Sequence, residues 1–295
     1  MRLIALLTCL LVNAPLTAAA EQFDATFAGD GRTLLAYLGS SLVPIALLEQ
    51  PGGHLMRVSR FVNNPNNCPD VVCIELVSVD AAGSPLAYGD VKALGFSSIA
   101  GAAVDSSGRI VVAGTINDAS TGDHFGVVRF NVDGSTDTGF AGGGVARVDF
   151  PGLQDHANAM ALDRHDNIIV VGGTQHTNWD RDFVIVRLLG TDGSPDPAFA
   201  GTGRSQVGFD LGAASGSLLD TATTVAIGND GRIVVAGFAY DNTIDRDRIG
   251  VARLNPDGSL DTGFCDPACN VMGDYSAIHS GRRVYYFGDS DVHED

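Results

Sequence analysis

The sequence is short of positive charge and of long apolar runs. Lys92 is the only lysine among 295 residues, and the formal net charge is −17 at pH 7. So acidic a surface repels phosphate backbones and anionic lipid headgroups, and we expect no nucleic-acid partner. After residue 20 no apolar run approaches the roughly 20 residues that span a bilayer, so we expect no membrane insertion.

Motifs of common hydrolytic sites are also missing. The chain has neither G-x-S-x-G nor H-E-x-x-H. Its seven histidines are scattered, and His156 beside Asp155 and His165 beside Asp166 are expected in surface turns. The turns NVDGSTD and NPDGSLD offer oxygen ligands but lack the twelfth-position Glu of an EF-hand loop. We therefore predict no cofactor, and calcium on these oxygen ligands is left open as an alternative.

The N-terminus has the pattern of a secretory signal peptide. Arg2 precedes the apolar run LIALLTCLLV, and the small residues Ala18–Ala20 follow. We expect cleavage after residue 20 and a single mature domain over 21–295, exported to the periplasm or the extracellular space. A buried N-terminal helix is the alternative.

Four cysteines remain in the predicted mature chain, namely Cys68, Cys73, Cys265 and Cys269. Export makes disulfides plausible, and the simplest pairing is Cys68–Cys73 and Cys265–Cys269, since each closes a short loop. Four thiolates on one zinc ion are the alternative, although zinc sites usually have tighter C-x2-C spacing.

One heptapeptide occurs twice. Gly108–Gly114 reads GRIVVAG and returns unchanged at Gly231–Gly237, and altered copies begin at residues 53, 166 and 281. Neighbouring copies are 50 to 65 residues apart, a period typical of solenoids, propellers and tandem arrays.

Each unit of the repeat is rich in β-branched residues bounded by Gly, Asp, Asn and Pro, which is the pattern of short strands and tight turns. The third unit predicts four strands, at residues 157–163, 167–174, 182–189 and 204–210. Four antiparallel strands in a unit of this length are typical of one propeller blade.

We therefore predict an all-β fold, a β-propeller of four-stranded antiparallel blades. Five blades are favoured, with the last completed from both chain ends. A four-bladed ring with extended ends and an open fragment are the alternatives. The expected units are 40–97, 98–150, 155–210 and 220–274, with a closing unit of 275–292 plus 23–38.

The repeat resembles a known family. Asp220 and Ala222, the run Asn229–Ile233 and the stretch Val251–Phe264 follow the pattern of the delta-60 repeat family, and the likeness is close over about residues 98–264. The resemblance implies a β-propeller fold and no established reaction.

An arginine and an aspartate recur in three units. A repeated catalytic pair is one interpretation, but an ion pair that fixes each hairpin is favoured, because active sites are seldom copied once per blade. The predicted structural pairs are Arg129 with Asp137, Arg187 with Asp196, and Arg253 with Asp261.

The loops INDASTGDHF, QHTNWDRDF and YDNTIDRDR differ between units and should lie on one face, where binding usually resides. The candidate binding residues are His176, Trp179, Asp180, Arg181, Asp245 and Arg246. We expect a monomeric, non-enzymatic scaffold that binds a protein or a glycan. A metal-dependent hydrolase or lactonase with its site in the central channel is the alternative, and a purely structural surface component is a third.

Overall fold

A computed structural model of the chain describes residues 42–61, 72–88, 92–118, 120–150, 154–177, 180–209, 211, 218–242, 245–264 and 282–285. Residues 1–20 and 23–38 lie outside these ranges, as do Cys68, Cys265 and Cys269. Cys73 is buried and disulfide-bonded. The signal peptide and the pairing of the cysteines stay predictions.

The described residues form four groups of four strands, which we call blades 1 to 4. Blade 1 contains β1 (Leu42–Gln50), β2 (His54–Phe61), β3 (Val72–Val79) and β4 (Pro85–Tyr88). Blade 2 contains β5 (Lys92–Val104), β6 (Ile110–Asp118), β7 (Gly122–Phe130) and β8 (Val145–Val148). Blade 3 contains β9 (Gln154–Leu162), β10 (Ile168–Thr177), β11 (Asp180–Leu188) and β12 (Arg204–Val207). Blade 4 contains β14 (Thr221–Ile227), β15 (Ile233–Asp241), β16 (Arg246–Leu254) and β17 (Arg282–Tyr285).

Consecutive strands within each blade pair antiparallel. The short strand β13 (Leu218–Leu219) adds a parallel pairing to β11. The start of β5 also pairs with β3, so blades 1 and 2 form one continuous sheet. The fold is thus all-β, as predicted. The described residues include one 3-10 helix, η1 (Phe140–Gly142), and in this part of the chain no helix has the length and apolarity to cross a membrane.

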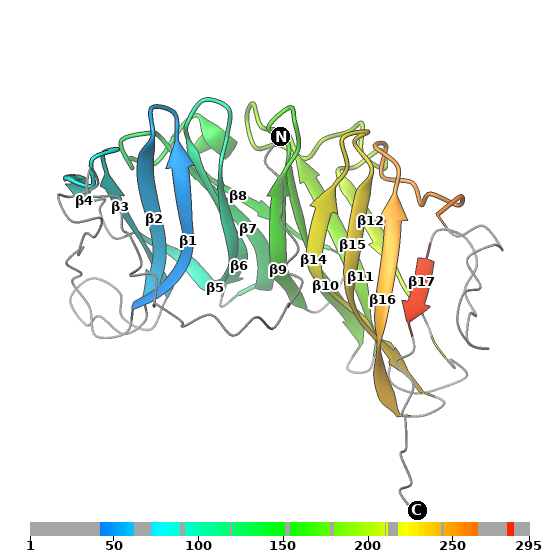
Figure 1. Cartoon of the computed structure of the whole chain (residues 1–295). Coiled ribbons are helices and arrows are strands. Elements are labelled where there is room, and N and C mark those ends of the chain that lie inside the picture. Colours follow the sequence, from blue (N-terminus) through cyan, green and yellow to red (C-terminus); the bar gives the residue numbers. More distant parts are fainter. Residues whose placement is uncertain are drawn as a thin grey trace, which may run out of the picture.

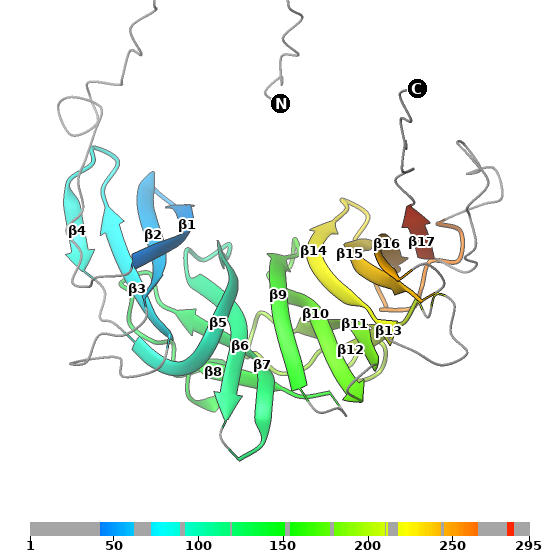
Figure 2. The ribbon, with the colours of Figure 1, turned by 90° about the horizontal axis from the view of Figure 1, so that it is seen from below.

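The blades stand face to face along an arc (Figures 1 and 2). The first strands β1, β5, β9 and β14 lie on the concave side of this arc, and each neighbours the first strand of the next blade. The hairpins between second and third strands define what we call the lower edge, at the bottom of Figure 1. The turns between first and second strands and between third and fourth strands define the upper edge.

Apolar packing between the blades explains why the second strands of blades 2 to 4 begin with apolar residues at successive positions. Side chains alternate between the two faces of a strand. Ile110 and Val112 on β6 pack in the cluster shared with blade 1, while Val111 and Ala113 pack in the cluster shared with blade 3. A third cluster lies between blades 3 and 4. Each fully buried Val or Ile contributes about 1.5–3 kcal/mol, so these clusters hold the arc together.

The two glycines of GRIVVAG have separate structural causes. Gly108 and Gly231 both have φ +80 in the turn before the second strand, a conformation that favours glycine. The final glycine lies where the first strand bulges toward the second. A Cβ on Gly114 would lie 2.1 Å from the carbonyl oxygen of Ser98, and one on Gly237 would lie 2.0 Å from that of Thr221. The heptapeptide is therefore a packing motif.

The strands of the third unit are confirmed, within a few residues, by β9 to β12. The prediction for the chain end differs from the structure. Residues 275–292 were expected to supply inner strands of a closing unit, whereas β17 pairs antiparallel with β16 as the outermost strand of blade 4. The copy at residue 281 keeps only the Gly, Arg and Val of the heptapeptide. The open edge of β16 offers unpaired backbone groups with which such a strand can pair.

Candidate functional site

Each predicted Arg–Asp pair is formed in the structure, at the upper edge. The Nε of Arg129, Arg187 and Arg253 donates to Oδ2 of Asp137, Asp196 and Asp261 over 2.7 Å in every case. The guanidinium also lies over a phenylalanine ring three residues after the aspartate, with 4.5 to 4.8 Å between its carbon and the ring centroid. We call these clusters the Arg–Asp–Phe units, and their phenylalanines are Phe140, Phe199 and Phe264.

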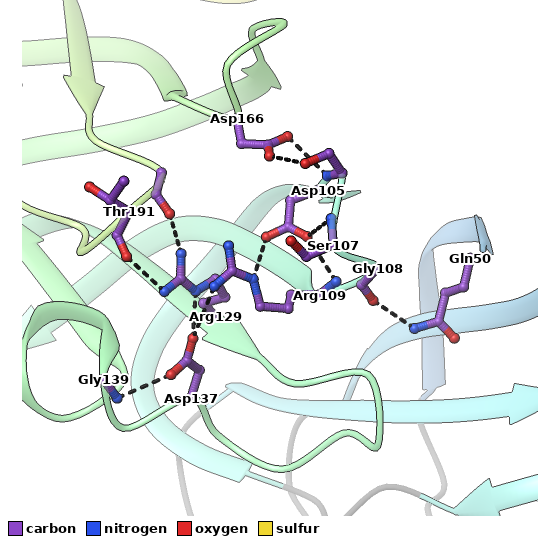
Figure 3. A network of polar contacts seen from close by, with 12 residues as sticks. Gln50, Asp105, Ser107, Gly108, Arg109, Arg129, Asp137, Gly139, Asp166 and Thr191 are labelled. Carbon is purple, nitrogen blue, oxygen red and sulfur yellow. Dashed lines mark hydrogen bonds and ion pairs between the residues drawn. The ribbon is translucent and has the colours of Figure 1, made fainter.

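The first two Arg–Asp–Phe units bind the next blade. Arg129 donates to the carbonyl oxygens of Gly190 and Thr191 in blade 3, the latter over 3.1 Å (Figure 3). Arg187 likewise donates to the carbonyl oxygen of Pro256 in blade 4 over 2.5 Å. Burial raises the pKa of Asp137, but the hydrogen bond and charge of Arg129 outweigh burial and hold that pKa below its usual value. Arg129 and Arg187 therefore stabilise the contacts between successive blades.

Other contacts at the upper edge also join successive blades. Gln50 of blade 1 donates to the carbonyl oxygen of Gly108 in blade 2 over 2.9 Å, and Ser106 of blade 2 donates to Asp166 of blade 3 (Figure 3). The Asp-Gly-Ser turns repeat one set of contacts from blade to blade. In each of them a serine hydroxyl and backbone N–H, two residues on, hold the pKa of the aspartate below its usual value; these aspartates are Asp133, Asp192 and Asp257.

The predicted binding residues that the structure describes lie at the lower edge. His176 is near the end of β10, and Asp180 and Arg181 begin β11. Asp245 precedes β16 with φ 56, and Arg246 begins that strand. They stand on the hairpins of two different blades. Trp179, on which the aromatic part of the prediction rests, lies outside the described residues.

These residues belong to polar clusters that differ from blade to blade. In blade 3, His176 Nε2 lies 3.4 Å from Asp182 Oδ2 and 2.7 Å from Gln206 Nε2, and Gln206 also donates to Asp182. In blade 4 the hydroxyl of Tyr240 donates to Asp245, and this bond raises the pKa of Tyr240.

Blade 2 carries a denser cluster that the sequence did not predict. His124 Nδ1 lies 2.6 Å from Asp149 Oδ1, and its Nε2 lies 2.7 Å from the hydroxyl of Thr121. A carboxylate oxygen of Asp155 lies within 4.8 Å of the other two potential ligand atoms. In the described part of the chain, His124, Asp149 and Asp155 are the one group of three residues able to hold a metal ion.

His156 was expected in a surface turn beside Asp155, and that expectation is wrong, because both residues lie on β9. Only 3% of Asp155 is exposed. Its Oδ1 accepts from the hydroxyl of Thr174 over 2.6 Å, and its Oδ2 accepts from the N–H of Phe150 over 2.8 Å. Burial raises its pKa, and the nearby charge of Asp149 adds to this effect. His156 also lies on β9, 3.7 Å from Asp123.

The concave side carries few groups for acid–base or metal chemistry. The four first strands read LVPIALLEQ, KALGFSSIAGAAV, QDHANAMAL and TATTVAI. Their ionisable residues are Glu49, Lys92, Asp155 and His156. Of these only Asp155 belongs to a potential ligand group within the described residues, and its two partners come from the lower edge.

Four-stranded antiparallel blades that pack face to face along an arc define a β-propeller type of repeat protein. Three segments, residues 106–140, 166–199 and 228–264, match the model of a family described as a domain of unknown function (DUF5122) β-propeller. Each matched segment runs from the turn before a second strand to the phenylalanine of an Arg–Asp–Phe unit. The delta-60 name is not part of that description and stays a resemblance.

No curated protein matches the sequence. The solved structures that match include the following two. The endo-arabinase from Bacteroides thetaiotaomicron VPI-5482 aligns with a TM-score of 0.41 and 13% identity, over 83% of this chain and 94% of the arabinase. The xylan β-1,4-xylosidase from Bacillus halodurans C-125 aligns with a TM-score of 0.39 and 13% identity, over 75% of this chain and 43% of the xylosidase.

Proposed function

We propose that the chain is an exported, non-catalytic scaffold that binds a glycan through its lower edge. The observation that carries this proposal is the contrast between the two edges. In blades 2 to 4 the upper edge repeats the same Arg–Asp–Phe units and Asp-Gly-Ser turns, whereas the described lower-edge hairpins of these blades each hold a different polar cluster. Repeated contacts serve the fold, and blade-specific residues on a rigid frame are where recognition usually resides.

The chemistry of the lower edge favours a hydroxyl-rich ligand. Its side chains include carboxylates, amides and imidazoles that hydrogen bonds already hold in place. The amide of Asn117, for example, donates to Asp123 over 2.7 Å in blade 2. Ordered acceptors and donors lose little entropy when they bind sugar hydroxyls. Trp179 belongs to the same hairpin edge in sequence, and a tryptophan ring offers an apolar face to a sugar.

A glycan array probed with the purified mature chain and its variants tests this proposal. Asp123→Asn should weaken binding about tenfold or more, since a hydrogen bond to a charged group is worth about 1.5–3 kcal/mol. Trp179→Ala should weaken binding as well, because it removes the apolar ring face. Asp230→Asn is the matched control, because Asp230 is exposed at the upper edge and pairs with Arg232. An array without bound glycans, or an equal loss in Asp230→Asn, would contradict the proposal.

A metal-dependent hydrolase or lactonase in the central channel is the alternative that the sequence leaves open. It needs acidic or imidazole side chains from several blades near the axis. The described first strands are built mainly from Ala, Gly, Ser, Thr and aliphatic residues, and this composition favours the scaffold.

We further propose that the arc closes with a fifth blade drawn from chain that the structure does not describe, including residues 23–38. The third Arg–Asp–Phe unit supports this. Arg253 is 29% exposed in its side chain, against 11% for Arg187, and within the described residues its guanidinium bonds no carbonyl of a further blade. Phe238 on β15 is also exposed, as expected if a fifth blade packs against this face of blade 4 in the closed arc.

Removal of residues 21–38 from the mature chain tests closure. If these residues complete a blade, their loss opens a sheet edge and exposes apolar surface, and the melting temperature should fall by several degrees, since about 1 kcal/mol shifts a domain of this size by roughly 2–4 °C. An unchanged melting temperature would contradict closure through this segment.

A further inference from the structure

The His124 cluster departs from the repeat in two of its three members. Asp155 has a counterpart in the next blade, Asp220, which accepts from the N–H of Phe209 over 2.6 Å. The repeat therefore accounts for one carboxylate at this place. In both blades it is a buried acceptor for a backbone N–H of the segment that leads into the blade. The repeat does not explain the other two groups.

Strand register shows what the next blade has instead. Phe125 pairs with Val148, which places His124 opposite Asp149 one step further along. In blade 3, Phe183 pairs with Val207, which places Asp182 opposite Gly208. The imidazole and the second carboxylate are therefore particular to the junction of blades 2 and 3.

The cluster has the form of a prepared ligand set. The contact of Nε2 with the Thr121 hydroxyl holds the imidazole so that Nδ1 faces the carboxylates, as outer partners orient metal-binding histidines. Thr174 and the N–H of Phe150 hold Asp155 in the same way. Each oxygen of Asp155 accepts one hydrogen bond and keeps a second lone pair.

Two of the three residues of the cluster are buried, and the third is exposed to solvent. His124 is 7% exposed and Asp155 is 3% exposed, so both are held by the fold. The side chain of Asp149 is 63% exposed, which leaves the third side open to solvent. Two carboxylates so close to each other repel, and a divalent cation between them would remove that repulsion.

We infer that His124, Asp149 and Asp155 bind a divalent ion of the zinc class at the lower edge, through Nδ1 and one oxygen of each carboxylate. One imidazole and two carboxylates match the nitrogen and oxygen ligands of zinc, whereas calcium takes six to eight oxygens. The ion takes the place of the proton that joins Nδ1 to Asp149. Three protein ligands leave a coordination position for water or an external oxygen ligand.

This inference is independent of the proposed glycan binding, because metal affinity is measured without a glycan. Isothermal titration of the chelator-treated mature chain with zinc chloride should show one site. Asp149→Asn and His124→Gln should each weaken that site about 10–100-fold or more, since even loss of an outer partner has this effect. Asp149 is exposed, so its variant should keep the melting temperature of the metal-free protein and remains informative if His124→Gln does not fold.

His176→Gln is the matched control. His176 lies at the same edge of blade 3 beside Asp182, but it belongs to no group of three ligands among the described residues. Its variant should bind zinc as the wild type does. Cobalt in place of zinc should give a visible spectrum without thiolate charge transfer, which separates this site from the cysteines. No heat at about 1 mM zinc, equal affinity in Asp149→Asn, or equal loss in His176→Gln would overturn the inference.

Discussion

Arg187→Met should lower the free energy of unfolding by about 3–5 kcal/mol, because removing one partner of a buried ion pair leaves the other charge uncompensated. Arg187 and Asp196 are both buried and joined over 2.7 Å. Methionine keeps an apolar side chain of similar length beneath Phe199, so the loss reports the charge and the hydrogen bonds. The carbonyl oxygen of Pro256 in blade 4 loses its donor as well.

Arg253→Met is the control for this prediction. Arg253 makes the same 2.7 Å contact with Asp261, but its side chain is more exposed and bonds no further blade within the described residues. Its replacement should cost only about 1–2 kcal/mol, between the values of surface and buried pairs. Urea denaturation followed by circular dichroism measures both variants. Equal losses would show that Arg187 does not act by joining blades 3 and 4.

The sequence predicted the pairs inside each unit better than the contacts between units. Arg187 and Asp196 lie close in the chain and recur with the period, so their pairing follows from the repeat. The bond from Arg187 to Pro256 joins residues of two units, and its existence depends on how the blades stack. A sequence repeat indicates the contacts within a hairpin directly, but the contacts between neighbouring blades become visible only in the tertiary structure.

The His124 cluster escaped prediction for a related reason. His124 and Asp149 come together because β7 and β8 are antiparallel in one particular register, and Asp155 joins them only after the chain has turned into the next blade. Comparison of the aligned positions, His124, Asp182 and Arg248, is the signal that could have drawn attention to it. Those positions differ in chemistry, while the residues that follow them, Phe125, Phe183 and Ile249, are all apolar.

Gly172→Ala should lower the free energy of unfolding by about 3 kcal/mol, at the upper end of the usual cost of overpacking. Gly172 is the counterpart of Gly114 and Gly237 in blade 3. A Cβ at this position would lie 1.8 Å from the carbonyl oxygen of His156 and 2.8 Å from the carbonyl carbon of the same residue. The obstacle is backbone, so no rotamer change relieves it and β9 must move away from β10.

Because β9 carries Asp155, this movement should reach the lower edge as well. We therefore expect Gly172→Ala to weaken zinc binding at the His124 cluster in addition to lowering stability in urea. Gly139→Ala is the control, since Ala198 occupies the corresponding position of the next unit and a Cβ on Gly139 meets only Asp137 Oδ1 at 3.3 Å. Gly139→Ala should change stability by less than about 0.5 kcal/mol. If Gly172→Ala were as mild, the close approach of β9 to β10 would not explain why this glycine recurs in blades 2, 3 and 4.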